Sequence, residues 1–540
     1  MPGIPRISWD RALFVSVLVW TFLLCCTPMK ALDIWWHLRT GQLIVEQLSV
    51  PWVDWYTFTE VSTPWIDLHW GFQLLAAAIY RLGGVPLLIL AKATVTTLAI
   101  GIAWSATGKQ LPVWIKTLCW LPAIIAVTGR CLVRPEALSL LFLAAWLWLL
   151  PRIADRPRLI WLLTALQLAW VNCHGLFVLG LIAGVAAVCD YMARSTLGGR
   201  CGIQAVDKQL HPLTLTLAVV LTTVACLCNP YFEAGALFPL ELYRKFSVDQ
   251  AYYAPRIEEF KPALVFLRQH GLRSLPFDAG LVLWLTTLLT FVALARRRSL
   301  DVYRLLLFTA FSYLGWEATR NWNVSAVVCS AILCGNFEEL RRTQAAETPS
   351  AAQVRRTLRL TQTGIALMGV LACVHLTGFW GKLTGDRQTF GLTEARNWYV
   401  HSAAQFAGQP GMPTRALIAN IGQAAVYIFH NAPEGRVWMD GRLEVCSRQT
   451  FETYQNIRLL MRRSDPSWMS IRGVRDANGQ LPVIILDSRY SRSEIDGLVR
   501  TPGWRPVFAD AAGAVFVDDA VATRLGLPPA DPTPLFNPDG

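Results

Sequence analysis

Aspartates, histidines and an arginine gather between residues 33 and 70, a short stretch that also holds six tryptophans. The residues that we take as candidates for chemistry are Asp33, His37, Arg39, Asp54, Asp67 and His69. Carboxylate and imidazole groups take up and release protons, and a guanidinium binds phosphate or carboxylate oxygens. Such residue types, so close together, indicate acid–base chemistry or the binding of a charged substrate.

Long apolar blocks surround this stretch and must position it. The chain is 54% hydrophobic and only 16% charged, whereas about a quarter of the residues in a soluble domain are charged. Uncharged blocks occupy residues 12–29, 137–150, 212–228 and 279–295. At about 1.5 Å per residue, helices of this length cross most of a hydrocarbon core about 30 Å thick. The sequence therefore predicts an α-helical polytopic membrane protein.

Charge and cysteine content exclude two other classes. The net charge of +12 does not indicate nucleic-acid binding, because the arginines form short clusters between apolar blocks, as at 296–298, 341–342 and 355–356. Such clusters are typical of cytoplasmic loops. Of the 13 cysteines, only Cys446 lies away from apolar segments. A disulfide framework in an exported domain would need partners there, so we interpret the cysteines as small apolar residues.

The distribution of basic residues predicts the topology. Arg6 and Arg11 place the N-terminus in the cytoplasm and residues 30–66 outside. The loop with Arg194, Arg200 and Lys208, the cluster at 296–298 and the stretch 338–357 are the basic, cytoplasmic loops. This arrangement needs helices near 212–228, 279–295, 303–317, 322–337 and 358–379. It puts residues 229–278 and everything after about 380 outside. We expect 11 crossings, or 13, because the region 67–193 allows more than one count.

The tail from about residue 380 has a different sequence pattern, in which short apolar strands alternate with helices. The expected strands are 416–421, 437–439, 482–487 and a hairpin of 507–509 with 514–517, and the expected helices are 451–463 and 493–500. We therefore divide the chain into a membrane domain, 1–379, and an extracytoplasmic α/β domain, 380–540. The tail has no GxGxxG and no phosphate-binding loop, and a packed accessory domain is its simplest interpretation.

Asp33 and His37 lie one helical turn apart if residues 33–47 form a helix, and both then face the same side. An acid at the edge of a membrane is costly unless it is solvated, paired or used. An aromatic belt at the membrane–water interface would explain the tryptophans. It would not explain the acids.

Other polar residues interrupt apolar surroundings, and two interpretations of each stay open. Arg134 and Glu136 open a helix, either as an ion pair that fixes two helices or as substrate contacts. Asn172 and His174 break a long apolar run, either lining a cavity or forming an interfacial turn. No second His or Cys lies at metal-ligand spacing from His174.

Residues 229–278 alternate aromatic and charged side chains and include Arg256. Amphipathic interfacial helices have this composition, and so would a lid over a lipid-linked substrate. Arg320, beside Glu317 and Asn321 at another outer helix end, either completes a site or forms a local ion pair.

Several short strings resemble the GT-C superfamily of membrane glycosyltransferases, which includes the protein O-mannosyltransferases and the aminoarabinose transferases of lipid A. The string Asp33-Ile-Trp-Trp-His-Leu-Arg-Thr-Gly41 is most similar to a group of poorly characterised bacterial GT-C-like proteins. That group also resembles the strings Arg134-Pro-Glu136, Trp170-Val-Asn-Cys-His-Gly175, Asn229-Pro230 and Asp440-Gly-Arg442. The long first outer loop, the second large outer loop and the outer C-terminal domain also agree with the superfamily.

The resemblance implies a bacterial inner-membrane enzyme that takes a sugar from a polyprenyl-phosphate carrier and passes it to a glycan, lipid or protein acceptor. Asp33 matches the position of the leading acid, which acts as general base or orients the acceptor. The lipid phosphate leaves as an anion, and Arg39, Arg134, Arg256 and Arg320 are candidates to stabilise it. Many members have two acids here, whereas this chain has Ile34 after Asp33. The departure weakens the expectation of a divalent metal, and no other cofactor is implied.

Two other classes compete with the transferase. A transporter or flippase would line a pathway with intramembrane polar residues, but the sequence shows no internal inverted repeats. A catalytically silent GT-C-like relative would scaffold an envelope assembly through its outer domain. The transferase hypothesis predicts that Asp33, His37 and an arginine for the lipid phosphate converge on one outward cavity that opens sideways to lipid. The scaffold predicts that these residues are dispersed or filled in by side chains, and the transporter predicts polar residues that continue to the cytoplasmic side.

Overall fold

The computed structural model describes residues 8–197, 212–253, 255–342, 350–384 and 389–532. The chain divides into two compact units. Met1–Pro28 with Val85–Leu392 forms what we call the helical unit, and Met29–Gly84 with Thr393–Gly540 forms the α/β unit. This division differs from the boundary expected at residue 380, which assigned residues 29–84 to the membrane domain.

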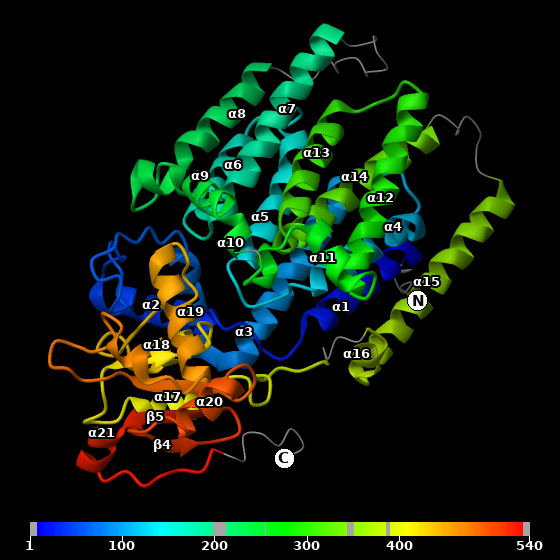
Figure 1. Cartoon of the computed structure of the whole chain (residues 1–540). Helices are drawn as coiled ribbons and strands as arrows, with labels where there is room; N and C mark the ends of the chain where they lie inside the picture. The colour runs from blue at the N-terminus through cyan, green and yellow to red at the C-terminus, as the bar shows by residue number, and fades with distance from the viewer. Residues whose placement is uncertain (1–7, 198–211, 254, 343–349, 385–388, 533–540) are drawn as a thin grey trace. The chain divides into compact units, whose positions relative to one another are not determined.

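Helices make up most of the helical unit (Figure 1). They are α1 (Trp9–Cys25), the second part of α3 (Trp70–Ala106), α4 (Val113–Thr128), α5 (Glu136–Leu149), α6 (Leu159–Val171), α7 (Val178–Leu197), α8 (Pro212–Ala225), α9 (Phe232–Val248), α10 (Gln250–Tyr253), α11 (Ala263–His270), α12 (Leu275–Arg296), α13 (Val302–Glu317), α14 (Trp322–Arg342), α15 (Ala351–Leu376) and α16 (Phe379–Thr384). The expected helices at 279–295, 303–317 and 322–337 are confirmed, each slightly longer than its apolar block.

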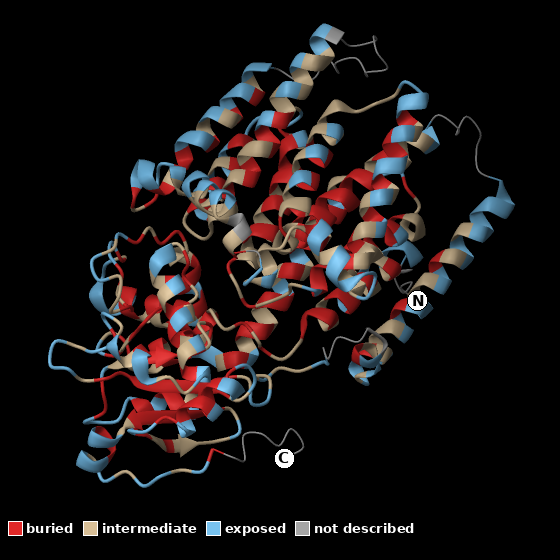
Figure 2. Ribbon diagram, viewed as in Figure 1, coloured by how far each residue is buried: buried red, intermediate tan, exposed pale blue. Residues whose placement is uncertain are grey.

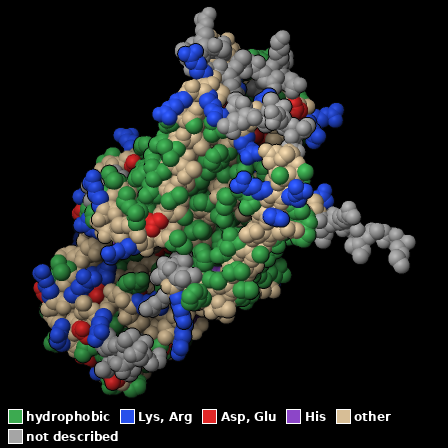
Figure 3. Space-filling view, turned by 90° about the vertical axis from the view of Figure 1, so that its right-hand side faces the viewer, with side chains coloured by type: hydrophobic (Ala, Val, Ile, Leu, Met, Phe, Trp, Pro, Cys, Tyr) green, Lys and Arg blue, Asp and Glu red, His purple; other side chains and the backbone are tan. Residues whose placement is uncertain are grey.

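Within the described residues, four helices are long and apolar enough to cross a membrane: Trp70–Ala106, Gly175–Thr196, Leu275–Arg296 and Ala351–Leu376. Shorter apolar helices add Val113–Thr128, Leu159–Val171 and Pro212–Ala225. Hydrophobic side chains cover a broad area of the face drawn in Figure 3. The number of crossings stays a prediction. Of the basic loops behind it, Arg200, Lys208 and residues 343–349 lie outside the described residues.

The buried centre of the helical unit is α14, which packs against α4, α12 and α13 (Figure 2). Its side chains are buried almost without interruption from Trp322 to Cys334. Many of them are Ala, Ser, Cys and Val, and small side chains let neighbouring helices approach closely where no hydrophobic effect drives association. Gly280 on α12 and Gly315 on α13 both leave room for the Trp322 ring.

A five-stranded sheet forms the core of the α/β unit, in the order β2-β1-β3-β5-β4. The strands β1 (Arg415–Ile418), β2 (Arg436–Val437) and β3 (Val483–Asp487) are parallel, and β5 (Gly513–Asp518) pairs antiparallel with β3 and with β4 (Trp504–Ala509). Around them lie α17 (His401–Ala407), α18 (Ala424–Asn431), α19 (Arg448–Arg462), α20 (Arg492–Val499) and α21 (Asp519–Arg524). The strands, the helices and the hairpin expected in the tail are therefore confirmed.

Residues 29–84 complete the α/β unit because they pair with the edge of its sheet. The Phe58 N–H donates to the Val437 carbonyl at 3.0 Å, and the Val437 N–H donates to the Tyr56 carbonyl at 2.9 Å. The helix α2 (Ile34–Gln47) packs against α18. These contacts cover the short strand β2, which would otherwise expose unpaired backbone groups.

A break at Gly83 and Gly84 in α3 coincides with the border between the units. Gly84 has φ of 59° and ψ of −151°, a region of backbone conformation that is essentially restricted to glycine. The helical segment before the break therefore belongs to the α/β unit and the segment after it to the helical unit.

Candidate functional site

Asp33 stands at the N-terminus of α2, where the helix begins at Ile34. The His37 N–H donates to the Asp33 carbonyl at 3.2 Å, so the expected helical turn between the two residues is confirmed. On the other side of Asp33 lies Gly441, where a Cβ atom would come within 2.9 Å of the Asp33 Oδ1 atom. A side chain at residue 441 would crowd this carboxylate, whereas glycine permits the close approach.

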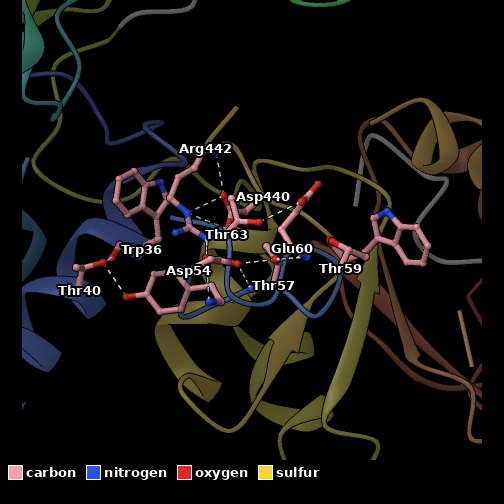
Figure 4. Close-up of polar contacts among 11 residues, drawn as sticks. Trp36, Thr40, Asp54, Thr57, Thr59, Glu60, Thr63, Asp440 and Arg442 are labelled. Carbon is pink, nitrogen blue, oxygen red and sulfur yellow. Dashed lines mark hydrogen bonds and ion pairs between the residues drawn. The ribbon is translucent and has the colours of Figure 1, made fainter. Parts of the chain in front are cut away.

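Arg442, next to Gly441, forms a fully buried ion-pair triad with two aspartates (Figure 4). Its Nη2 donates to Asp54 Oδ1 at 2.7 Å and to Asp440 Oδ2 at 2.6 Å. The guanidinium also lies over the Trp65 ring, 4.3 Å from the centroid, and the Tyr56 ring, 4.7 Å away. Aromatic faces attract a cation in a desolvated setting. The triad therefore joins the stretch around Asp54 to the Asp440–Arg442 corner.

Asp54 holds its charge although it is buried. Burial raises the pKa of its carboxyl, but the charge of Arg442 and hydrogen bonds from Thr57 and the Tyr56 N–H outweigh this, and the pKa is lowered. The Thr57 N–H donates to Oδ2 at 2.9 Å and the Tyr56 N–H to Oδ1 at 3.1 Å. These bonds use both carboxylate oxygens. Asp54, a candidate substrate contact in the sequence, thus holds residues 54–57 in their turn and binds them to Arg442.

Two histidines and Asp67 form a second polar group in the α/β unit. His69 Nδ1 lies 3.3 Å from Asp67 Oδ1, and the His37 and His69 ring centroids are 5.5 Å apart. Gln73 Nε2 lies 3.4 Å from His37 Nδ1. Burial lowers the pKa of His69, but Asp67, with smaller contributions from Glu444 and Asp33, raises it overall. Neighbouring carboxylates, Asp67 above all, therefore favour the protonated form of His69.

Arg39 is engaged with the tail and with its own helix. Its Nε donates to the Ala432 carbonyl at 3.0 Å, and Nη1 donates to Gln42 Oε1 at 3.2 Å and to Glu46 Oε1 at 3.4 Å. These contacts fasten α2 to residues that follow α18. Arg39 acts in the structure as an anchor of α2.

A cationic cluster of three arginines and two glutamates forms in the helical unit. Arg130 makes two bonds of 2.7 Å to the Glu136 carboxylate and one of 2.8 Å to Glu259 Oε2, which also accepts from Arg134 at 3.1 Å. Arg320 lies over the Phe260 ring, 4.3 Å from its centroid. Three guanidinium groups and two carboxylates leave a net charge of +1. We call this group the arginine cluster.

The charges in the arginine cluster are strongly coupled. Burial raises the pKa of the Glu259 carboxyl, but the charges of Arg130, Arg134 and Arg320 outweigh it and lower the pKa. Arg320 differs from its neighbours. Burial lowers the pKa of its guanidinium despite the attraction of Glu259, and the described part of the chain gives it no hydrogen-bonded or ion-paired carboxylate.

The remaining candidates make local contacts. His174 Nδ1 lies 2.7 Å from the Ser139 hydroxyl, one turn after Glu136, so it is tied to the helix that carries Glu136. Asn172 donates to the carbonyls of Leu168 and Cys228 at 2.8 and 2.9 Å, which closes the turn after α6. Arg256 is exposed and donates to the Tyr252 carbonyl at 2.6 Å within the same turn. The structure thus brings most of the sequence candidates into two groups, one in each unit, and leaves Arg39, Asn172 and Arg256 outside both.

Several residues of these groups were not among the sequence candidates, namely Arg130, Glu259, Asp440, Arg442 and Glu444. Two signals were available: the Asp-Gly-Arg string and the spacing of Arg130 before Arg134. Neither reveals its partner, which lies more than a hundred residues away. Within the described residues, no three His, Cys, Asp or Glu side chains converge to hold a metal ion. No step proposed below uses one.

Known proteins are similar to this chain in fold but not in sequence. The sequence matches no model of a protein family and no curated protein. Among solved structures, the chain is similar to ArnT from Cupriavidus metallidurans bound to undecaprenyl phosphate, at a TM-score of 0.51 and 14% identity over 93% of this chain and 97% of that one. It is also similar to the Archaeoglobus fulgidus oligosaccharyltransferase tethered to an acceptor peptide, at a TM-score of 0.51 and 11% identity over 89% of this chain and 69% of that one.

This chain has a GT-C fold. Both similar structures are GT-C glycosyltransferases, and the alignments span most of the chain. The resemblance expected from the short strings is confirmed at the level of the fold. The GT-C fold and the apolar helices together make this a membrane protein.

The first prediction concerns the triad. Replacing Arg442 by Met leaves Asp54 and Asp440 buried without their cation, and breaking a buried pair in this way costs about 3–5 kcal/mol. We expect a clear drop in the melting temperature of the purified protein. Arg448→Met, which removes the exposed pair with Glu452, is the matched control and changes the melting temperature little. Equal melting curves for the two variants would contradict the account.

The second prediction concerns His69. Its pKa in the folded protein is raised above the ordinary value of about 6.5. The added stability is therefore fully present below about pH 6.5 and lost as the pH rises through the folded-state pKa. We expect His69→Gln to lower the melting temperature more at pH 6 than at pH 9. His270→Gln, at an exposed position, serves as control. A penalty that grows with pH would refute the assignment.

Proposed function

We propose that this protein transfers a sugar from a polyprenyl-phosphate carrier to an acceptor on the extracytoplasmic face of a bacterial inner membrane. The GT-C fold supports the class of reaction, since one similar structure, ArnT, is bound to undecaprenyl phosphate and the other holds an acceptor peptide. The observation that carries the proposal is the position of Asp33. It lies at the start of α2 and packs against Gly441, the residue between Asp440 and Arg442 of the buried triad. A proton acceptor must be held in position to act, and this close packing supports such a role.

Asp33 is the proposed general base. The acceptor hydroxyl or amide loses its proton as its oxygen or nitrogen attacks the anomeric carbon of the donor sugar. A carboxylate within hydrogen-bond reach takes that proton. Asp33 also interacts with His69, since its charge is one of the contributions that raise the pKa of His69.

The arginine cluster is the proposed site for the lipid phosphate. As the glycosidic bond breaks, its electron pair stays on the phosphate oxygen, and the departing phosphate gains negative charge. Guanidinium groups stabilise that charge without a proton transfer. Arg320 is best suited, because Glu136 and Glu259 are bonded to Arg130 and Arg134 instead.

The other candidates receive supporting roles in this proposal. Asp54 and Arg39 position the loop and α2, as their contacts indicate. Asp67 holds His69, and Asn172 with His174 shapes the turn beside α5. Arg256 keeps the segment that precedes Glu259 and Phe260 in its turn.

The central prediction of the proposal is that Asp33→Asn abolishes transfer in a folded protein. Loss of a general base typically costs about 10²–10⁴-fold in rate. Envelope glycans, lipids and glycoproteins of the native host would be profiled by mass spectrometry beside a deletion strain, with protein levels measured in each. Asp33→Asn should reproduce the sugar loss of the deletion strain. Glu46→Gln removes an exposed carboxylate from the same helix and should retain the sugar.

Two outcomes would contradict the proposal in different ways. If the deletion strain loses a sugar and Asp33→Asn does not, Asp33 is not the base, and a scaffolding role gains support. If the deletion strain loses no sugar, transferase activity itself is refuted.

The phosphate site has its own prediction. Arg320→Met removes one charged hydrogen-bonding group, which is worth about 1.5–3 kcal/mol, or about tenfold to a hundredfold in Kd. Binding of undecaprenyl phosphate would be measured by native mass spectrometry of the protein released from nanodiscs. Arg268→Met, an exposed position on α11, should leave binding unchanged. Equal affinities for the two variants would remove Arg320 from the site.

A further inference from the structure

Two cysteines from distant parts of the sequence meet in the helical unit. Cys25 is the last residue of α1, and Cys131 lies in the connection between α4 and α5. The two thiols are close enough to interact electrostatically. Cys25, Cys26 and Ala93 form a small buried cluster against which Cys131 packs. Cys25 is buried, whereas Cys131 is only partly so.

A lysine accompanies this pair. The Lys92 ammonium donates to the Cys131 carbonyl at 3.1 Å and to the Thr27 hydroxyl at 3.4 Å. The Thr96 hydroxyl lies 3.8 Å from the Cys131 sulfur. A cation and a hydroxyl beside a thiol favour the thiolate, which is the reactive form.

We propose that Cys25 and Cys131 form a reversible disulfide that ties the end of α1 to the segment carrying Arg130 and Arg134. The sequence alone led us to interpret every cysteine as a small apolar residue, because the contact between residues 25 and 131 is visible only in the fold. Cys131 immediately follows Arg130 of the arginine cluster. The bond therefore limits the movement of the segment that presents two of its guanidinium groups.

Forming this bond oxidises two thiols, and a disulfide-bearing oxidant accepts the two electrons. The Cys131 thiolate attacks one sulfur of the oxidant, forms a mixed disulfide and expels one thiolate. The Cys25 thiolate then attacks the Cys131 sulfur and expels the second. The protein loses two protons and two electrons, and the oxidant leaves as two thiols. Cys131 is the more accessible of the two thiols, and its neighbours Cys25 and Lys92 lower its pKa, so Cys131 is the attacking thiol.

A second cysteine pair offers an internal comparison. Cys119 on α4 and Cys334 on the adjacent helix α14 are also neighbours, with Lys116 nearby. Both of these residues are buried, at 3% and 0% exposure. An oxidant has no access to either sulfur. The two pairs therefore share their chemistry and differ in accessibility, which predicts that only the first pair reacts in the folded protein.

This inference rests on the proposed function in one respect, the side of the membrane on which the end of α1 lies. On the extracytoplasmic side, the compartment is oxidising and disulfides persist. The bond itself is tested without any measurement of sugar transfer. A failure of the disulfide would therefore leave the proposed transferase untouched, and the reverse also holds.

The experiment treats the full-length protein in nanodiscs with glutathione disulfide, blocks remaining thiols with N-ethylmaleimide and maps tryptic peptides by mass spectrometry. Peptide 131–152 contains Cys131 as its only cysteine, and peptide 12–30 contains Cys25 and Cys26. We expect these two peptides to be linked and to separate on reduction. The link should persist in Cys26→Ser and disappear in Cys25→Ser, and Cys119 should remain unlinked.

The role of Lys92 is measured in the same assay. Lys92→Met should slow formation of the link about threefold to tenfold at pH 7, because the thiolate fraction falls. Three results would overturn the proposal: a link through Cys26, no link in a protein whose Cys131 reacts with N-ethylmaleimide, or a Cys131 thiol that neither reagent modifies.

Discussion

One buried cation supports the part of this protein that carries Asp33. Arg442 is fully buried, bonds to Asp54 and Asp440, and is enclosed by aromatic rings. A guanidinium removed from water is tolerated only when carboxylates and hydrogen bonds replace its hydration. Arg442 and Asp54 are 388 residues apart in the sequence. The requirement to satisfy this charge therefore brings together two distant parts of the chain.

The pairing of Arg442 with Asp54 fixes the structure of both segments, residues 29–84 and the tail. Residues 56–58 extend the sheet edge at β2, and α2 packs against α18 with Arg39 bonded to the Ala432 carbonyl. The Asp440–Arg442 corner approaches Asp33 closely because Gly441 has no side chain. The tail, which the sequence describes most simply as an accessory domain, thus builds the framework that holds Asp33. In the proposed transferase, the C-terminal residues contribute by positioning the base.

Local elements of the fold were predictable from the sequence, and long-range contacts were not. Apolar blocks indicated α12 and α13 to within a few residues, and alternation with turn residues indicated the β4–β5 hairpin. The one-turn spacing of Asp33 and His37 was expected on the condition that residues 33–47 are helical, which the structure meets. Short strings even indicated the GT-C fold. Each of these depends on neighbouring residues or on a family pattern.

The pairings that define the two polar groups depend on tertiary structure. Nothing near Asp54 in the sequence specifies Arg442 as its partner, and nothing near Arg130 specifies Glu259. For the same reason the division of the chain at Gly84 was missed, since it depends on which segment residues 29–84 pack against. Arg39 illustrates the error this produces, because a candidate for a phosphate contact proves to be bonded to Ala432, Gln42 and Glu46.

Hydrogen–deuterium exchange on Asp54→Asn tests most directly whether the two distant segments hold Asp33 as one folded structure. The substitution removes one charge from residues 29–84 and leaves the tail sequence unchanged. The account predicts that backbone amides of 437–446 and of α2 lose protection together, while β4 and β5 keep theirs. Faster exchange confined to residues near 54, with 437–446 and α2 unchanged, would contradict it.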